Sequence, residues 1–174
     1  IFGPLTDYKK SGEAGSRIMV KTPTGTKYIY LVGYDNAKRW RDILGLTLNG
    51  SLIEEVNQAN DDFIDELILR TFRNKGFMYC SSNGADPDIR VYTEYLDAGR
   101  PLEKYNDEIP DSTWECLDKK EHDPDYRYYF FTFDDNPTMS KEEVIKLAKK
   151  FAPGSWKYLT KILGERGIRS GAIF

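Results

Sequence analysis

The segment between residues 51 and 81 constrains the fold of this chain more than any other. It holds two short apolar runs, 51–56 and 77–81, on either side of a stretch that begins at Asn60. Apolar residues recur in that stretch with a period of about 3.6 residues, as on one face of an α-helix. They are Phe63, Ile64, Leu67 and Ile68. A strand, a helix and a second strand joined by short breaks form a βαβ unit, in which the two strands run parallel. We therefore expect an α/β fold with a mostly parallel sheet flanked by helices.

Two further strand signals extend this alternation. Residues 17–21 and 26–32 are apolar-biased and flank Thr22-Pro23-Thr24-Gly25, a turn sequence that predicts a hairpin. Residues 126–133 are rich in Tyr and Phe and give the strongest strand signal of the chain. We expect one parallel sheet with strands near 27–32, 51–56, 77–82 and 127–133.

Helix signals lie between and after these strands. Short helices are expected over 37–44, after the capping pair Asp35-Asn36, and over 113–120, with Ser112 as the cap. Ser140 and Glu143 form a capping-box sequence at the start of an amphipathic helix over 142–151. The residues of that helix expected to face inward are Val144, Ile145, Leu147, Ala148 and Phe151. A last helix is expected over 155–163.

Length and composition narrow the class of protein. A chain of 174 residues has room for one domain. Residues 1–16 contain three Gly and one Pro with little periodicity, so we expect a flexible N-terminal arm there and the domain over 17–174. The 25 Lys and Arg against 28 Asp and Glu give a net charge of −3, which excludes a wholly basic nucleic-acid-binding protein. Cys80 and Cys116 are too few for a disulfide framework and lack metal-ligand spacing.

Polar clusters follow three of the expected strands: Glu54-Glu55-Val56-Asn57, Ser81-Ser82-Asn83 and Asp134-Asp135-Asn136. In a parallel sheet, ligands bind beyond the carboxyl ends of the strands. Two adjacent carboxylates there suit phosphoryl transfer, because one can hold Mg²⁺ while the other polarises the attacking water. Spacing alone leaves a second interpretation open, in which all three clusters are solvated turn residues.

The order of these segments resembles the large terminase subunit of tailed bacteriophages, and most closely the branch found in prophages of Gram-positive bacteria. The similar stretches are 22–40, 51–60, 77–88, 92–105, 129–144 and 154–174. The resemblance implies part of a P-loop, RecA-like ATPase domain, a hydrolase that drives viral DNA into the capsid.

The resemblance also implies roles for particular residues. Glu54 stands where the Mg²⁺-associated Asp of the family's Walker B segment is expected, and Glu55 stands where the catalytic Glu is expected. The longer side chain of Glu54 is a departure that is expected to weaken or displace the metal, since Mg²⁺ demands near-ideal octahedral geometry. Ser82 and Asn83 match the nucleotide-sensing coupling motif, although the family often has Thr-x-Asn-Pro where this chain has Ser-Ser-Asn-Gly.

The resemblance further implies ATP and Mg²⁺ as cofactors of the intact protein. The family's P-loop ends in Gly-Lys-Ser/Thr, and here Gly12 and Gly15 precede the Walker B segment without that sequence. We therefore expect this chain alone to bind ATP weakly and not to hydrolyse it. The family's nuclease domain would begin just after Phe174 and is absent from this sequence, so we expect the chain to be the second half of the ATPase domain, cut at both ends. The implied partners are double-stranded DNA, the portal protein and the small terminase subunit, with a homo-oligomeric ring allowed and no membrane, in the host-cell cytoplasm.

Two other functions remain open. A metal-dependent nuclease would take its carboxylates from Glu54, Glu55, Asp134 and Asp135, provided that the two strand ends lie within about 4 Å of each other through two metals. A non-catalytic prophage remnant or assembly module would use none of these residues chemically.

Overall fold

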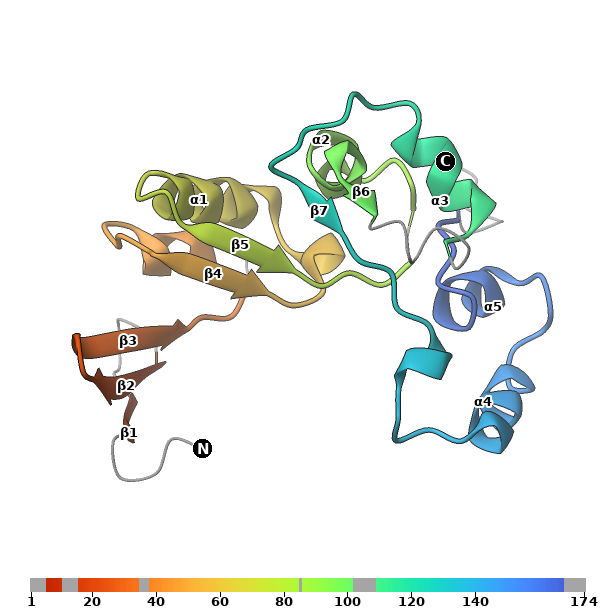
Figure 1. Ribbon diagram of the computed structural model, residues 1–174, viewed down its shortest axis with the longest axis horizontal. Coiled ribbons are helices and arrows are strands. Elements are labelled where there is room, and N and C mark those ends of the chain that lie inside the picture. The colour runs from red at the N-terminus through yellow and green to blue at the C-terminus, as the bar shows by residue number, and fades with distance from the viewer. Residues whose placement is uncertain (1–5, 11–15, 35–37, 85, 102–108, 168–174) are drawn as a thin grey trace. The chain divides into compact units, whose positions relative to one another are not determined.

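The computed structural model describes residues 6–10, 16–34, 38–84, 86–101 and 109–167. It divides into two compact units, residues 1–80 and 81–174. Each unit has its own short sheet or sheets, and each is described by itself (Figure 1). The helices and strands of both units are those of an α/β fold, as the sequence predicts. Among the described residues, no helix combines the length and the apolar character needed to cross a membrane.

The first unit begins with an antiparallel sheet of three strands, β1 (Thr6–Lys10), β2 (Ser16–Thr22) and β3 (Gly25–Leu31), in that order. The predicted hairpin is confirmed, because Thr22 pairs with Gly25 and Ser16 pairs with Leu31. The expectation that the strand near 27–32 joins the parallel sheet is wrong. A turn of two residues between β2 and β3 allows only antiparallel pairing, whereas a parallel pair needs a long crossover.

The first of these strands lies where the sequence predicts a flexible arm. Strand β1 pairs with the first part of β2, with Thr6 opposite Val20 and Lys10 opposite Ser16. The rest of the expected arm, residues 1–5 and 11–15, lies outside the described residues. A strand edge with free backbone groups can order a neighbouring segment that has little apolar patterning of its own.

The predicted βαβ unit follows. Strands β4 (Gly50–Ile53) and β5 (Phe77–Cys80) pair in parallel, with Gly50 opposite Phe77 and Ile53 opposite Cys80. Helix α1 (Asp61–Phe72) connects them and packs against both strands (Figure 1). The Asn60 side chain caps the helix by accepting from the backbone N–H of Asp62, which satisfies one of the unpaired donors of its first turn. The core of this unit contains Ile43, Ile53, Val56, Phe63, Ile64 and Leu67.

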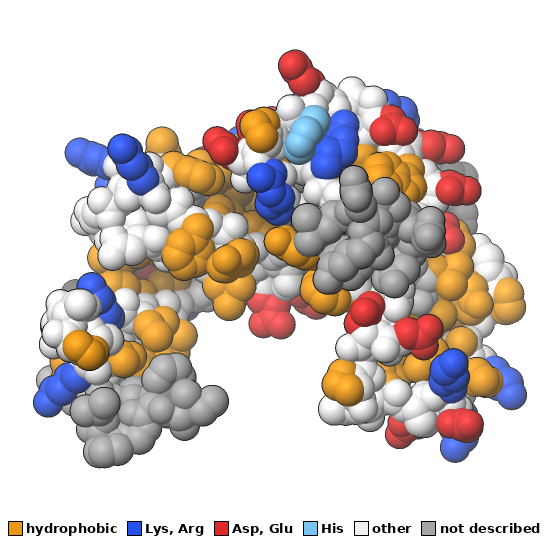
Figure 2. All heavy atoms as spheres, viewed as in Figure 1, with side chains coloured by type: hydrophobic (Ala, Val, Ile, Leu, Met, Phe, Trp, Pro, Cys, Tyr) orange, Lys and Arg blue, Asp and Glu red, His pale blue; other side chains and the backbone are white. Residues whose placement is uncertain are grey.

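The two faces of the β4–β5 pair differ. The Ser51 side chain faces α1, whose Thr71 hydroxyl donates to the Ser51 hydroxyl at 3.1 Å. Alternate residues of the two strands point the other way and are exposed: Leu52, Phe77 and Tyr79. Figure 2 shows hydrophobic side chains gathered over this pair of strands. The strand β4 also ends three residues earlier than predicted, so that Glu54 and Glu55 lie beyond it.

Before β4, the expected helix over 37–44 is a 3-10 helix, η2 (Arg39–Ile43), that places Ile43 in the core. It ends before Gly45, whose φ of 78° is a left-handed conformation that glycine adopts at little cost. The predicted caps Asp35 and Asn36 lie outside the described residues.

The second unit is mostly helical. It contains α2 (Arg90–Glu94), η4 (Leu96–Ala98), α3 (Asp111–Leu117), η6 (Phe133–Asp135), α4 (Lys141–Ala148) and α5 (Trp156–Lys161). A short parallel pair joins β6 (Arg100–Pro101) to β7 (Arg127–Tyr128). The buried hydrophobic residues of the second unit are Val91, Tyr92, Ala98, Ile109, Leu117 and Phe130.

The strand predicted over 127–133 is mostly absent among the described residues of this unit. Only Arg127 and Tyr128 pair with a partner strand, and the Thr132 side chain then starts η6 by accepting from the Asp134 N–H. Phe131 is 69 % exposed. A high strand propensity expresses how well side chains fit a pleated, half-buried surface, and most of this segment has no such partner in the described chain.

The helix starts agree with the sequence in one case and differ in another. The capping box of α4 is confirmed, since the Glu143 carboxylate accepts from the Ser140 N–H at 2.8 Å and the Ser140 hydroxyl accepts from the Glu143 N–H at 3.3 Å. Ile145, expected to face inward, is 54 % exposed. Helix α3 begins at Asp111 after Pro110, so Ser112 lies inside its first turn and is not the cap.

Candidate functional site

Glu54 and Glu55 form a tight turn at the carboxyl end of β4. The turn lies between two buried residues, Ile53 at the end of the strand and Val56 at the start of the 3-10 helix η3 (Val56–Gln58). Glu54 is exposed and Glu55 is half-buried. Because the residues on both sides are fixed in the core, the backbone that carries the two carboxylates is held in place.

The Glu55 backbone is the unusual feature of this turn. Its φ and ψ are both 50°, the left-handed conformation, which only a few per cent of residues other than glycine adopt. The Glu55 carboxylate accepts a hydrogen bond of 2.6 Å from the Gln58 side-chain amide. Backbone strain of this kind persists where the surrounding structure fixes it, and it is concentrated at functional sites.

A second contact fixes the Glu54 backbone. The Tyr34 hydroxyl donates to the Glu54 carbonyl oxygen at 2.5 Å, and the Tyr34 ring packs against Phe63 of α1 with centroids 6.1 Å apart. The Glu54 carbonyl is therefore held while its carboxylate faces solvent. Glu54 is thus exposed to solvent, whereas the carboxylate of the adjacent Glu55 is held by the side-chain amide of Gln58.

The pair fits one kind of metal site. Within the described residues there is no group of three or more His, Cys, Asp or Glu side chains that could hold a metal ion. Mg²⁺ in phosphoryl-transfer sites, however, is usually bound through one or two carboxylates together with substrate phosphates and waters. The carboxylates of Glu54 and Glu55 match that requirement in number and in type of donor.

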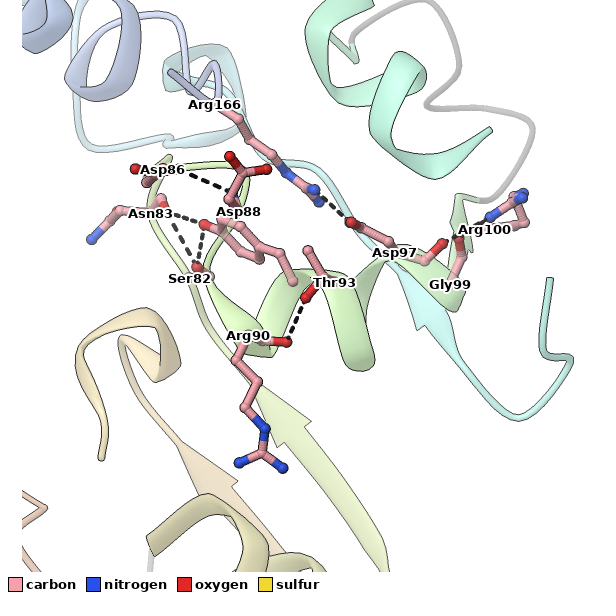
Figure 3. Close-up of polar contacts among 11 residues, drawn as sticks. Ser82, Asn83, Asp86, Asp88, Arg90, Thr93, Asp97, Gly99, Arg100 and Arg166 are labelled. Carbon is pink, nitrogen blue, oxygen red and sulfur yellow. Dashed lines mark hydrogen bonds and ion pairs between the residues drawn. The ribbon is translucent and has the colours of Figure 1, made fainter. Parts of the chain in front are cut away.

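Ser82 and Asn83 belong to the second unit, just after β5. The Tyr92 hydroxyl donates to the Asn83 carbonyl oxygen at 2.6 Å and forms a 2.7 Å hydrogen bond with the Ser82 hydroxyl (Figure 3). Ser82 and Asn83 are exposed, and Tyr92 is 3 % exposed. The two predicted coupling residues are thus positioned by one buried side chain of α2.

A buried ion pair lies next to Tyr92. Arg166 pairs with Asp97, and its guanidinium carbon lies 4.2 Å from the centroid of the Tyr92 ring (Figure 3). Burial disfavours the charge of Arg166, but the hydrogen bond to Asp97, the neighbouring Tyr128 and the Asp97 charge outweigh it and raise the pKa of Arg166 above its usual value. Burial likewise raises the pKa of Tyr92, and the Ser82 hydrogen bond and the Arg166 charge only partly offset this.

Sequence reasoning missed Tyr92, Asp97 and Arg166. Asp97 and Arg166 are 69 positions apart, so no local spacing connects them. The one available signal is an arginine in a Gly-rich tail with Glu165 beside it, and that pattern is also common in solvated tails. The pair lines a pocket of about 400 Å³. Two buried polar atoms of residues at this pocket, Arg166 Nη2 and Ser112 Oγ, have no hydrogen-bond partner among the described residues.

The third polar cluster has a local structural role. The Asp135 carboxylate accepts from the Thr132 backbone N–H at 2.7 Å and from its hydroxyl at 3.2 Å, which completes a capping box for η6. Asn136 accepts from the Thr138 N–H at 3.1 Å in a further turn. These contacts match the turn interpretation of Asp134-Asp135-Asn136.

The fold and this site together define a class. A β4–α1–β5 unit with two carboxylates just beyond a parallel strand is an α/β arrangement that places its polar groups where such sheets bind ligands. The sequence model of one family, described as "Phage terminase large subunit", matches residues 5–165. The chain belongs to the phage terminase large subunit family.

Solved structures are similar as well. The large terminase of a thermophilic bacteriophage matches with 23 % identity and a TM-score of 0.66, over 91 % of this chain and 33 % of that one. Structures of that terminase in complex with ADP and with ATP-γ-S match with 22 % identity and TM-scores of 0.63 and 0.61. The likeness establishes the fold, and this chain spans about a third of the length of that terminase. Among curated proteins, none matches this sequence.

Proposed function

We propose that this chain is part of the ATPase motor of a phage terminase large subunit that packages viral DNA into the capsid. The observation that carries the proposal is the left-handed conformation of Glu55 just beyond a parallel strand, with its carboxylate held by Gln58. A non-glycine residue in that conformation is costly. The exposed turn residue Lys75 adopts it as well, so the conformation supports the proposal together with the strand-end position of Glu55 and its contact with Gln58. Membership of the family supplies the reaction that this position would serve.

The two carboxylates take different roles in this proposal. Glu54 faces solvent on a fixed backbone and would associate with Mg²⁺, which neutralises developing charge on the phosphates when bound. Glu55 is half-buried and held by Gln58, so it is suited to orient and polarise the attacking water. The extra methylene of Glu54 relative to the usual Asp is expected to weaken or displace the metal, since Mg²⁺ demands near-ideal octahedral geometry.

The nucleotide in this proposal is ATP. The related phage terminase has been solved with ADP and with ATP-γ-S, which supports a nucleotide site in proteins of this fold. Ser82 and Asn83 would sense the state of the phosphates and couple it to motion, since both are exposed but anchored through Tyr92. Double-stranded DNA, the portal protein and the small terminase subunit would be the partners, in the host-cell cytoplasm, and a homo-oligomeric ring and a prophage origin belong to the same proposal.

The roles of Glu54 and Glu55 are tested in a polypeptide that joins this sequence to a terminase phosphate-binding loop. Glu54→Ala is expected to weaken nucleotide binding and to raise the Mg²⁺ concentration needed for it, because a metal ligand acts in the ground state as well as in the transition state. Asp134→Asn is the matched control, since Asp134 is an exposed acid at a turn. It should change neither property.

Two other outcomes would contradict the proposal. Mg²⁺-dependent DNA cleavage that is lost in both Glu54→Ala and Asp134→Asn would favour a metal-dependent nuclease. Unchanged nucleotide binding in Glu54→Ala at every Mg²⁺ concentration would favour a non-catalytic module, in which the acidic pair is ordinary turn chemistry.

A further inference from the structure

Tyr92 connects two segments of the second unit that are far apart in the sequence. Its hydroxyl bonds to Ser82 and to the Asn83 carbonyl at 2.7 and 2.6 Å, while its ring lies against the guanidinium of Arg166. Tyr92 is buried, with 3 % of its surface exposed. The Tyr92 hydroxyl thus binds the segment 82–84, and the face of the Tyr92 ring contacts Arg166.

The backbones of the two segments also approach closely. A Cβ atom added to Gly84 would overlap the Glu165 carbonyl oxygen, so no side chain fits at that position without displacing the backbone of residue 165. The segment 163–167 is in turn bound to α5. The Glu165 N–H donates to the Leu159 carbonyl at 3.0 Å, and the Trp156 indole N–H donates to the Gly167 carbonyl at 3.0 Å. A shift of segment 82–84 would therefore press on a segment that is fixed to a helix.

The position of Arg166 depends on few contacts. Its guanidinium pairs with the buried carboxylate of Asp97 (Figure 3) and lies over the Tyr92 ring. It is also close to Tyr128. The Nη2 atom is buried and has no hydrogen-bond partner among the described residues. A buried charged group with an unused donor is not locked by a full set of acceptors. Asp97 and the two tyrosines must therefore supply most of what keeps Arg166 in place.

We propose that Tyr92 is a positioning residue that makes segment 82–84 and segment 163–167 move as one body. The inference rests on the proposed function for its biological meaning, since segment 82–84 carries the residues proposed to sense the nucleotide. A change at Ser82 and Asn83 then passes through the Tyr92 hydroxyl and ring to Arg166, and from there to α5. Tyr92 itself touches no reacting atom in this proposal.

The link is tested first without nucleotide, by amide hydrogen exchange on the chain as it stands. Tyr92→Phe removes the hydroxyl and keeps the ring. We expect exchange to rise roughly tenfold or more at residues 82–84 and also at 164–167, because the variant loses both hydrogen bonds of the Tyr92 hydroxyl, to Ser82 and to the Asn83 carbonyl. Tyr129→Phe is the control, because Tyr129 is 49 % exposed and should change neither segment. A rise confined to 82–84 would overturn the link.

A second variant separates the ring contact from the hydroxyl. Arg166→Lys keeps the charge for Asp97 but loses the planar group that lies on the Tyr92 ring. The link predicts faster exchange at 82–84 in this variant, although the substitution lies more than eighty positions away in the sequence. Unchanged exchange there would contradict the proposal even if 164–167 became more dynamic.

The third arm uses nucleotide in the polypeptide joined to a phosphate-binding loop. ATP-γ-S is expected to change the exchange of residues 164–167 in the parent protein. In Tyr92→Phe that change should be lost even at ATP-γ-S concentrations that saturate the variant. Retention of the change in saturated Tyr92→Phe would contradict the link. Absence of nucleotide binding in the parent would refute the proposed function, whereas the first two arms would still decide the link.

Discussion

Removal of the Arg166 side chain is expected to destabilise the second unit severely. In the pair that it forms with Asp97, the two side chains are only 3 % and 7 % exposed. Arg166→Met leaves the Asp97 carboxylate buried without its partner, and breaking a buried pair in this way costs about 3–5 kcal/mol. Asp97→Leu leaves the opposite charge unpaired, and a similar loss is expected.

Urea unfolding measures this loss. Trp114 and Trp156 lie in the second unit and Trp40 in the first, so the experiment is made in a Trp40→Phe background. With a urea m-value of about 1–3 kcal/mol per M, a loss of about 3–5 kcal/mol moves the midpoint by about 1 M or more. The double variant Arg166→Met with Asp97→Leu should recover most of the loss, because an apolar pair of similar volume often replaces a buried ion pair without cost.

The pair Arg90–Glu94 provides a matched control in the same unit. Its side chains are 32 % and 49 % exposed, and exposed i,i+4 pairs contribute about 0.3–0.5 kcal/mol. Arg90→Met should therefore shift the urea midpoint only slightly. Equal losses in Arg166→Met and Arg90→Met would refute the role of the buried pair, as would a double variant less stable than both single variants.

Two other perturbations have defined outcomes. In Gly76→Ala, the new Cβ would meet the Thr71 carbonyl oxygen at 2.8 Å and displace the start of β5. Urea unfolding should therefore show a loss of about 1–3 kcal/mol in the free energy of unfolding. Gly167→Ala is the control and should be neutral, because a Cβ there meets nothing closer than 4.0 Å. The backbone and hydroxyl hydrogen bonds from Ser140 hold the pKa of Glu143 below its ordinary value of 4.5. The capping box therefore stabilises α4 fully above pH 4.5, and this stabilisation is lost as the pH falls through the lowered pKa of the folded state. After correction for the intrinsic pH dependence of exchange, the protection factors of amides 140 and 143 should fall in acid, and Ser140→Ala should flatten this pH dependence. Protection factors that are independent of pH would contradict the assignment.

The parts of the fold that sequence predicts are those fixed by neighbouring residues. The period of Phe63, Ile64 and Leu67 identifies α1, and the flanking apolar runs then require a parallel pair of strands. The turn at Thr22–Gly25 likewise identifies the hairpin. The same turn should have excluded β3 from the parallel sheet, because its short connection and a parallel pairing are incompatible.

The remaining features depend on partners distant in the sequence. Strand propensity at 127–133 is high, but only two residues find a partner strand in the described chain. The contact of Arg166 with Asp97 and Tyr92 needs residues about seventy positions apart to meet, and no local pattern encodes that. At the candidate site, sequence identified the acidic pair at a strand end, whereas the left-handed conformation of Glu55 is visible only in the structure.

Single-turnover hydrolysis of ATP by Glu55→Gln tests the proposed role of the acidic pair most directly. The measurement is made in the polypeptide that joins this sequence to a terminase phosphate-binding loop, with nucleotide affinity measured in parallel. Glutamine keeps the size of the side chain and its contact with Gln58 but cannot act as a base. We expect unchanged nucleotide binding and hydrolysis slower by about 10²–10⁴-fold, the range for a group that activates the nucleophile. Near-normal turnover in Glu55→Gln would contradict the catalytic role and leave the family likeness valid for the fold alone.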